Sequence, residues 1–409
     1  MLRYFLGILL CSSLATQVTA EAVQGYFGAQ LTEVLEADVP AAQAEDIRGV
    51  LVLTVLPESP AAAAGFAAND IILAVGGVPM VGPTETARHL ASLGAGAEVE
   101  VQFMRNAEQH STKLRLGINP WQNADQPDPS EAYFGVREYA DLAYGGDDRH
   151  KLDLYVPDTG EPMPMLLWIH GGGWSFGDRK QDRSLALRLA ERGVAVASMS
   201  YRLSAGRWAD PNAPAQGVVH PAHINDVADA FVWLQAQAQR YGYDETALYV
   251  GGHSAGGHLA ALLATDADYL RARGASLEAV AGAVPIGGAY DIPDYHAALI
   301  SGDPEMGQAH IEAVFGKDPL GWVKASPTAF IETSAVPMLV VVEEQAGFER
   351  YARRLEVEAH AAGRDNVAFL SAKGRTHGNV LLLMSGRHED SVRHAILRFL
   401  HSGQVKALG

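Results

Sequence analysis

The sequence predicts an α/β protein: a mostly parallel sheet with helices on both faces, preceded by a smaller α+β domain. The chain has 409 residues, of which 48% are hydrophobic and 19% charged, so it can bury two cores. Residues 119–131 carry three prolines and several turn formers, which is typical of a linker. This linker separates residues 21–118 from residues 132–409. In the second part, short apolar runs alternate with segments of helical spacing, the pattern of a parallel sheet.

Charge and cysteine content exclude several classes of function. The formal net charge is −17, which argues against nucleic acid or an anionic membrane surface as the main partner. Cys11 is the one cysteine in the chain. A disulfide framework, an iron–sulfur cluster and a thiolate zinc site are therefore excluded.

Residues 1–20 have the features of a secretory signal peptide. Arg3 supplies the charged start, residues 4–10 form a short apolar run, and Val18-Thr19-Ala20 is a small-residue cleavage site. The apolar run is shorter than the ~20 residues that span a bilayer, so an uncleaved anchor is the weaker alternative. We therefore expect an exported protein, periplasmic or secreted. Leu10 stands where a lipoprotein signal has a small residue, so lipidation is not expected.

The apolar runs set out the elements expected in each part. In residues 21–118 we expect mostly short strands with one or two helices. The expected strands are 49–56, 71–75, 98–103 and 112–116, and the expected helix is 84–93. In residues 132–409 the expected strands are 152–155, 165–169, 194–199, 247–250, 280–286, 338–342 and 367–370. The expected helices there are 184–192, 224–234 and 259–264.

Residues 24–117 resemble a PDZ domain of the type attached to bacterial periplasmic proteases. The motifs that carry the resemblance are Gly49-Val50-Leu51-Val52, Pro57-Glu58-Ser59-Pro60-Ala61, Ala64-Gly65-Phe66 and the segment 69–77, NDIILAVGG. The resemblance implies that a peptide C-terminus adds as a strand at a sheet edge. The loop that would hold its carboxylate is Tyr26-Phe27-Gly28-Ala29. The alternative is a spacer that no longer binds peptides.

Ser254 lies in a pattern typical of a nucleophile elbow. Gly252-x-Ser254-x-Gly256 follows an apolar strand and precedes an apolar helix. Small residues are needed on both sides because larger side chains would collide with the neighbouring strand and helix. The serine hydroxyl is then exposed at the start of a helix, beside the N–H of Ala255.

A second glycine motif, His170-Gly171-Gly172-Gly173-Trp174, also follows an apolar strand. Its glycines leave backbone N–H groups unshielded, as a developing oxyanion requires. We assign Gly172 and Gly173 to an oxyanion hole together with Ala255. The N–H of Trp174 is a substitute for one of them.

With both motifs in this order, residues 133–399 resemble the α/β-hydrolase fold. The closest group is that of esterases and lipases with an HGGGW loop, which includes bacterial acyl esterases and kynurenine formamidase-like enzymes. Supporting segments are 151–157 (KLDLYVP), Tyr201-Arg202-Leu203, His220-Pro221, Asp226 and Ser326-Pro327. The resemblance implies serine acyl hydrolysis with no cofactor and no metal.

His377 is the expected base of this site. The fold orders its triad as serine, acid and histidine, so the base comes late in the chain. His377 follows the strand 367–370 and lies in a loop before the last helical region. His394 and His401 fall on the final helix, and we expect His253 to pack the elbow.

The acid is less clearly indicated. The family pattern places an aspartate just past strand 338–342, where this chain has Gln345 and Ala346. Glu344 is the acid we expect, with Glu343 next, because this fold accepts glutamate in its triad. Asp291 and Asp294 are further candidates. The alternative is a degraded triad in which both glutamates are solvated.

These residues predict an exported serine hydrolase that cleaves carboxylic esters of a small or medium acyl substrate through an acyl-enzyme. His377 would accept the proton of Ser254. The PDZ-like domain would dock a protein C-terminus. Two alternatives remain at this point. The same triad could act on a formamide or peptide amide, or an impaired hydrolase could serve as a PDZ-based binding protein.

Overall fold

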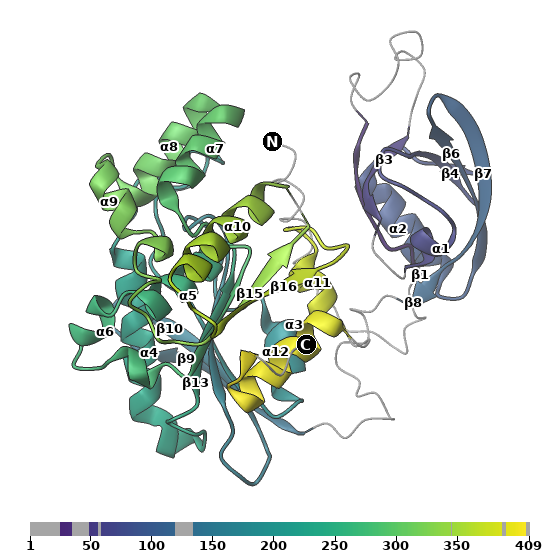
Figure 1. Cartoon of the computed structure of the whole chain (residues 1–409). Coiled ribbons are helices and arrows are strands. Elements are labelled where there is room, and N and C mark those ends of the chain that lie inside the picture. Colours follow the sequence, from purple (N-terminus) through teal and green to yellow (C-terminus); the bar gives the residue numbers. More distant parts are fainter. Residues whose placement is uncertain are drawn as a thin grey trace. The chain divides into compact units, whose positions relative to one another are not determined.

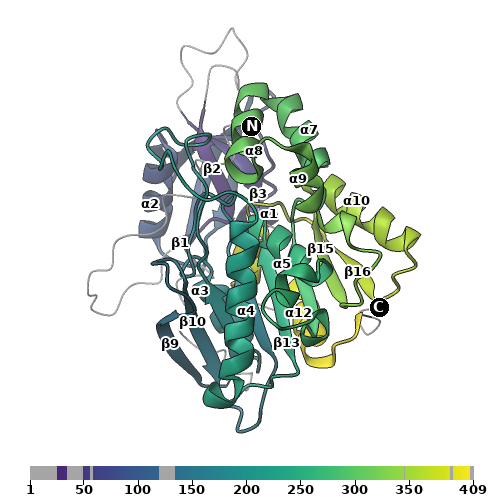
Figure 2. The same ribbon diagram turned by 90° about the vertical axis from the view of Figure 1, so that its left-hand side faces the viewer.

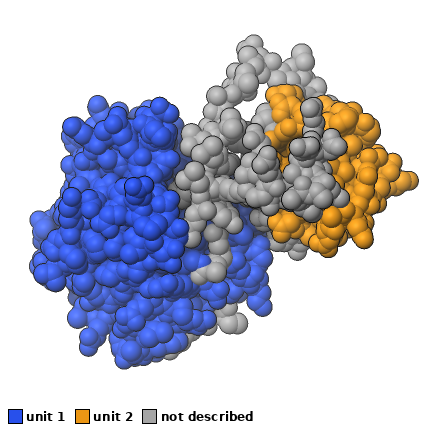
Figure 3. Space-filling view, turned by 90° about the horizontal axis from the view of Figure 1, so that it is seen from above, with its two compact units in different colours: residues 1, 127–409 blue, residues 2–126 orange. Residues whose placement is uncertain are grey.

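The computed structural model describes residues 25–34, 49–55, 59–118, 134–344, 346–386 and 390–405. The chain forms two compact units, residues 2–126 and residues 127–409, drawn in orange and blue in Figure 3. The expected signal segment, residues 1–20, and the expected linker, residues 119–131, lie outside the described residues.

The first unit is a small antiparallel sheet with two helices (Figure 1). Its main sheet has the order β2-β3-β4-β6-β7, with β5 paired to β4, while β1 pairs with β8. The strands are β1 Gly25–Tyr26, β2 Ala29–Glu33, β3 Val50–Val55, β4 Ile71–Val75, β5 Val78–Pro79, β6 Glu98–Arg105, β7 Glu108–Arg115 and β8 Gly117–Ile118. The helices are α1 Pro60–Ala63 and α2 Pro83–Leu93.

The core of the first unit is apolar, and a buried carboxylate at its edge pairs with a partly exposed arginine. Phe66 packs between Phe27 and Phe103, at ring-centroid distances of 5.1 and 4.8 Å. The carboxylate of Asp70 is buried and accepts two hydrogen bonds of 2.7 Å from Arg105. Because both oxygens are paired, the charge is buried without an unsatisfied acceptor.

The second unit is built on an eight-stranded sheet in the order β16-β15-β14-β13-β11-β12-β10-β9. Neighbours from β16 to β12 run parallel, whereas β10 pairs antiparallel with both β12 and β9. The strands are β9 Val136–Ala143, β10 Lys151–Pro157, β11 Met165–Ile169, β12 Ala195–Met199, β13 Leu248–His253, β14 Gly282–Ile286, β15 Met338–Glu343 and β16 Val367–Ala372.

Helices cover both faces of this sheet (Figure 2). Side chains of α4, α5 and α10 share one apolar core with the sheet, and those of α3, α11 and α12 share the other. The helices of this unit are α3 Arg183–Ala190, α4 Ala222–Tyr241, α5 Ala255–Thr265, α6 Asp268–Arg271, α7 Ile292–Gly302, α8 Pro304–Phe315, α9 Pro319–Lys324, α10 Ala346–Ala361, α11 Val380–Met384 and α12 Ser391–Ser402, with short 3₁₀ turns at Leu277–Ala279 and Pro327–Ala329.

The central strands consist largely of apolar residues because helices cover both faces of the sheet. In β11, Met165, Leu167 and Ile169 enter one core, whereas Leu166 and Trp168 enter the other. Successive side chains of a strand point to opposite faces, so a strand covered on both sides must be apolar throughout. The predicted architecture, a mostly parallel sheet between helices with a smaller α+β unit before it, is confirmed.

Several parts of the second unit were not expected, among them helix α10, strand β9 and the helices before β15. Strand β9 is largely exposed, so its residues lack the apolar run that marks a buried strand. Helices α7, α8 and α9 are inserted between β14 and β15 and add a separate group of helices to this unit (Figure 1). No helix of the described residues is long and apolar enough to cross a membrane.

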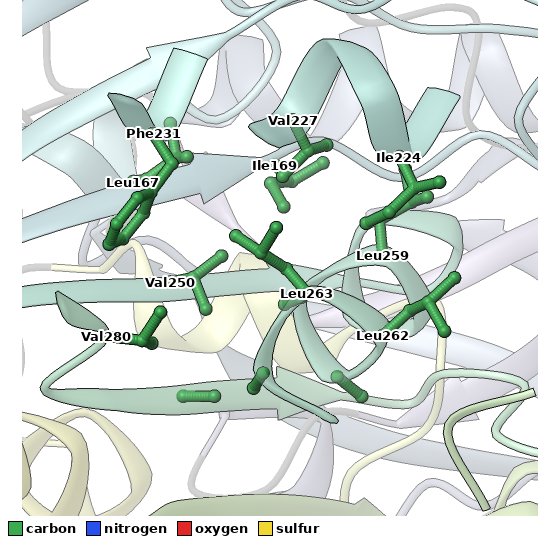
Figure 4. Close-up of a cluster of buried hydrophobic side chains, with 14 of the residues drawn as sticks. Leu167, Ile169, Ile224, Val227, Phe231, Val250, Leu259, Leu262, Leu263 and Val280 are labelled. Atoms are coloured by element: carbon green, nitrogen blue, oxygen red, sulfur yellow. The ribbon is translucent and has the colours of Figure 1, made fainter. Parts of the chain in front are cut away.

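Substitution of Leu263 tests whether helix α5 belongs to the core of the second unit. Its side chain is fully buried on α5, among the cluster drawn in Figure 4. We expect Leu263→Ala to lower the free energy of unfolding by about 2–5 kcal/mol, since a buried leucine leaves a cavity. Urea unfolding followed by tryptophan fluorescence measures it, because five of the six tryptophans lie in residues 127–409 and dominate the signal.

Leu320→Ala is the matched control, because Leu320 is 72% exposed on α9. Its effect should stay within about 0.5 kcal/mol. Equal midpoints for the two variants would contradict the core assignment of α5.

Candidate active site

Ser254 lies in a strained turn between strand β13 and helix α5. Its backbone has φ 57° and ψ −120°, a conformation that residues other than glycine rarely adopt. The N–H of Ser254 donates to the carbonyl of Ile286 at 2.8 Å, and its own carbonyl accepts from the N–H of His258 at 3.0 Å. The turn is therefore fixed on both sides, and the half-buried serine stands at the N-terminus of α5.

Close packing explains the glycines around this serine. A Cβ on Gly256 would lie 2.0 Å from the carbonyl oxygen of Ile169, and one on Gly252 would lie 2.5 Å from the same atom. Every residue of α5 is buried, because this helix packs against the strands and against α4. The elbow pattern is thus a packing requirement, as the sequence predicted.

The loop 170–174 lies directly beside the serine. A Cβ placed on Gly171 would be 3.2 Å from Cβ of Ser254. Gly172, Gly173 and Trp174 all have positive φ, at 109°, 57° and 58°, so the loop turns sharply. The carbonyl of Gly172 accepts hydrogen bonds from the N–H groups of residues 175 and 176, which closes the turn.

The predicted oxyanion donors lie in this loop and at the start of α5. Within the described residues, the N–H groups of Gly172, Gly173 and Ala255 bond to no other group. The same holds for the N–H of Trp174, the predicted substitute. A cluster of unpaired N–H groups beside a serine is the environment that stabilises a developing negative oxygen.

Trp174 fixes the end of this loop in the protein interior. Its Nε1 donates to Nδ1 of His258 at 3.2 Å, and Nε2 of His258 donates to the carbonyl of Ala325 at 2.7 Å. Burial lowers the pKa of His258 to about 3, so this histidine stays neutral and can accept the hydrogen bond. The indole also packs on Phe315 of α8, at 5.0 Å between ring centroids. The inserted helices thus support the loop.

The structure replaces Glu344 with Glu343 as the partner of His377. Nδ1 of His377 donates to Oε2 of Glu343 at 2.8 Å. Glu343 is the last residue of β15 and is buried, whereas Glu344 is exposed and its carboxylate accepts from the N–H of Gly374 at 2.7 Å. Adjacent residues at a strand end point to opposite sides, so only one of the two glutamates can face the histidine.

The other candidates for the acid lie elsewhere. Asp291 caps α7 by accepting from the N–H of Asp294 at 3.0 Å, and Asp294 forms an ion pair with Arg350. Gln345 lies outside the described residues, and α10 begins at Ala346.

His253 has a role that the sequence did not suggest. Its Nε2 donates to Oε1 of Glu343 at 3.1 Å, so one carboxylate receives hydrogen bonds from two histidines. The rings of His253 and His377 lie 4.3 Å apart. Because His253 directly precedes Ser254, this contact brings the loop of His377 to the elbow. His401, on the last turn of α12, lies outside this group, and its Nε2 donates to the carbonyl of Arg192.

The electrostatics favour a charged acid and a neutral base. Burial alone would raise the pKa of Glu343, but the attraction of His377 in its protonated form and the hydrogen bonds from both histidines outweigh it and lower this pKa. Burial lowers the pKa of His377, and the charge of Glu343 only partly opposes this. With Nδ1–H bonded to the carboxylate, Nε2 of a neutral His377 is the unprotonated nitrogen that a base needs.

The same three side chains are the group that could hold a metal ion among the described residues. The ligand atoms of His253, Glu343 and His377 all lie within 4.8 Å of one another. Both histidine nitrogens in this group donate to the carboxylate, and a metal ion would have to replace those protons.

In the first unit, the predicted peptide-binding loop joins β1 to β2. The carbonyl of Phe27 accepts from the N–H of Ala61 at 2.9 Å, which fixes the loop to α1. Gly28 has φ 83°, and a Cβ there would lie 2.3 Å from Cβ of Ser59, so only glycine fits. Tyr26 ends β1, and Ala29 begins β2, which lies at an edge of the sheet beside α2.

Comparisons with known proteins agree with this architecture. The family model of the PDZ domain matches residues 25–116, and the BD-FAE family model matches residues 152–346. The chain is 27% identical to Esterase LipC of Mycobacterium tuberculosis, over 80% of this chain and 89% of that protein. It is 32% identical to the probable carboxylic ester hydrolase LipM of the same organism, over 53% of this chain and 51% of LipM.

Other relatives match over a shorter part. The probable isoprenylcysteine alpha-carbonyl methylesterase ICME of Oryza sativa is 34% identical, and the match covers 32% of this chain and 29% of that protein. Among solved structures, the hyperthermophilic esterase of Pyrobaculum calidifontis is 25% identical with a TM-score of 0.52, covering 71% of this chain and 88% of its own. Esterase B of Lactobacillus rhamnosis has the same fold, at 22% identity and a TM-score of 0.55, covering 71% of this chain and 90% of its own.

The resemblances expected from the sequence are therefore confirmed: residues 25–116 match the PDZ domain, residues 152–346 match the BD-FAE family model, and the second unit is a carboxylesterase-like hydrolase of the α/β-hydrolase fold.

Proposed function

We propose that this protein is an exported serine esterase that hydrolyses carboxylic esters through an acyl-enzyme on Ser254. His377 is the general base, Glu343 is the acid of the triad, and the N–H groups of Gly172, Gly173 and Ala255 form the oxyanion hole. The observation that carries the proposal is the buried Glu343 carboxylate bonded to His377 beside a strained, half-buried serine.

The proposed reaction has two stages: acylation of Ser254 and hydrolysis of the resulting acyl-enzyme. Nε2 of His377 accepts the proton of Ser254 while Oγ attacks the ester carbonyl, and the oxyanion receives hydrogen bonds from the N–H groups. His377 then gives the proton to the leaving alcohol. Water, activated by the same histidine, releases the carboxylic acid. Glu343 stabilises the imidazolium in both steps and keeps Nε2 free in the resting state.

The surroundings of the loop favour a small or medium acyl group. A Cβ on Gly173 would lie 3.0 Å from the indole of Trp208, so an aromatic wall lies close to the proposed oxyanion site. Trp208 stacks on His310 with ring centroids 3.7 Å apart. We propose that these stacked rings limit the length of the acyl chain that the site accepts.

The two alternatives have less support. An impaired hydrolase would lack an acid partner for His377, whereas Glu343 supplies a buried carboxylate to it. Amide or formamide cleavage needs the same triad, but the relatives described above are named as esterases or ester hydrolases. Turnover of short acyl esters against matched N-formyl and peptide amides separates the two activities.

We also propose that the PDZ domain docks the C-terminus of a protein partner. Strand β2 is paired on one side only within the sheet, and α2 packs beside it. An extended peptide can add to such an edge, with its carboxylate at the loop Tyr26-Phe27-Gly28-Ala29. Export, which the N-terminal segment predicts, would place this pair of domains in the periplasm or outside the cell.

Labelling with an alkyl phosphonate tests the nucleophile. We expect mass spectrometry to find one phosphonyl group per chain, on Ser254. The rate of hydrolysis of p-nitrophenyl acetate and butyrate should fall in proportion to the fraction of chains labelled. Ser254→Ala should lower kcat by roughly 10⁴-fold or more, since no other group takes over the covalent step. Undiminished turnover in this variant, or a label on another residue, would refute the assignment.

Glu343→Gln and Glu344→Gln form a matched pair that tests the acid. We expect Glu343→Gln to lower kcat by about 10³–10⁴-fold, because an amide cannot stabilise the imidazolium. Glu344→Gln keeps an oxygen for the N–H of Gly374 and should change kcat by less than about threefold. The reverse order of effects would restore Glu344 as the acid.

The pairing of His377 with Glu343 predicts how kcat/KM depends on pH. The base must be neutral, so kcat/KM should fall with decreasing pH at a midpoint below about 6.5, the ordinary value for histidine. The charge of Glu343 raises the pKa of His377 against the effect of burial. Its removal in Glu343→Gln should therefore move the midpoint further to low pH, while Glu344→Gln leaves it in place.

Fluorescence anisotropy tests the PDZ domain. Peptides selected from a C-terminal display library should bind the full chain, and amidation of their C-terminal carboxylate should weaken binding by about tenfold or more, as expected for hydrogen bonds to a charged group. Equal affinity of the acid and amide forms, or an empty selection, would identify this domain as a spacer.

A further inference from the structure

The second hydrogen bond to the triad acid comes from His253. Nε2 of His253 donates to Oε1 of Glu343 at 3.1 Å, while Oε2 accepts from Nδ1 of His377 at 2.8 Å. The Glu343 side chain has no exposed surface, and the side chain of His253 is 11% exposed. Each oxygen of a buried carboxylate is thus matched to one histidine.

We propose that His253 is a positioning residue of the esterase reaction: it holds Oε1 of Glu343 so that Oε2 stays aligned with His377. The inference rests on the proposed function, because it assigns a role relative to the triad. His253 acts through Glu343 and touches neither the substrate nor the reacting atoms in this scheme.

A glutamate needs such a contact more than an aspartate does. Its side chain has one more rotatable bond, so the carboxylate can turn away from the histidine at little cost in torsional energy. Below the carboxylate lies Gly287, with φ 55°, where a Cβ would be 2.5 Å from Oε1. On that side the carboxylate packs against the backbone of Gly287, which has no side chain that could donate a hydrogen bond to Oε1. His253, at the carboxyl end of β13, supplies the hydrogen bond that holds this oxygen.

The backbone places His253 firmly enough for this task. It ends β13, in register with Ile286 of β14, and the next residue is fixed by its hydrogen bond to Ile286. Its ring packs on that of His377 at 4.3 Å. His377 is held in turn by Phe348 of α10, whose ring stacks on it at 3.5 Å between centroids. The side chains of His253, His377 and Glu343 thus pack together as one cluster.

A purely structural role makes a different prediction. If His253 only packs the elbow, as the sequence suggested, its removal disturbs Ser254 directly, and the loss is independent of Glu343. If His253 acts through Glu343, its removal matters only while the carboxylate is present. A double-mutant cycle between the two positions separates these cases.

The experiment measures p-nitrophenyl butyrate turnover and the rate of phosphonylation of Ser254 in four variants of the full chain. They are His253→Phe, His253→Gln, Glu343→Gln and the double variant His253→Phe/Glu343→Gln. Phenylalanine keeps an aromatic ring but has no donor, whereas the amide of glutamine reaches the place of Nε2. Circular dichroism and thermal melting verify the fold of each variant.

We expect His253→Phe to lower kcat by about 10- to 100-fold, the size of a hydrogen bond to a charged group, with KM changed by less than about threefold. His253→Gln should recover most of the loss. In the Glu343→Gln background, His253→Phe should lower kcat by less than about threefold. If His253→Phe is not folded, His253→Asn replaces it, because its shorter amide also fails to reach Glu343.

The inference is overturned if His253→Phe retains the activity of the parent chain, if glutamine restores nothing, or if the loss is equally large without the Glu343 carboxylate. The proposed function fails in a different way: the parent chain itself then neither hydrolyses the ester nor accepts the phosphonate. The two failures are thus distinguishable in one set of measurements.

Discussion

A carboxylate without contact to water must have its charge matched by donors, and Glu343 meets this condition through two histidines from different parts of the chain. The donors come from the end of β13 and from the loop after β16, and the acceptor comes from the end of β15. These three segments meet because the carboxyl ends of parallel strands lie at one edge of the sheet. The geometry of the candidate site is therefore inseparable from the strand order.

The same edge of the sheet explains why so much glycine gathers near the serine. Helix α5 starts immediately after the elbow and lies so close to the sheet that Gly256 approaches the carbonyl of Ile169 and Gly257 that of Ile286. A side chain at either place would push the helix away and change the strained turn at Ser254. The loop 170–174 fills the remaining space from the other side. Tight packing thus produces both the exposed hydroxyl and the unpaired N–H groups.

Much of this arrangement was predictable from the sequence, and the exceptions have physical reasons. Buried strands such as β11 and β4 were predicted with their observed bounds, because continuous apolar runs mark them. Ser254, His377 and the glycine loop follow from motifs. The sequence favours Glu344 over Glu343 because the family pattern fixes the acid relative to a strand end, and sequence alone locates that end only to within a residue or two. Helices α7–α9 carry no motif, and the contact of His253 depends on strand order.

Gly287 gives the hydrolase domain a constraint that extends to its relatives. The longer acid at 343 occupies the volume where a Cβ of residue 287 would stand. A homologue with aspartate at the corresponding strand end withdraws its carboxylate by one methylene and frees that volume. Positions 287 and 343 should therefore covary: alanine or serine at 287, already strained at φ 55°, would in addition clash with the longer acid. A side chain at 287 beside the longer acid would clash with its carboxylate, whereas the shorter acid beside Gly287 meets no such clash, so the acid would be expected to shorten first.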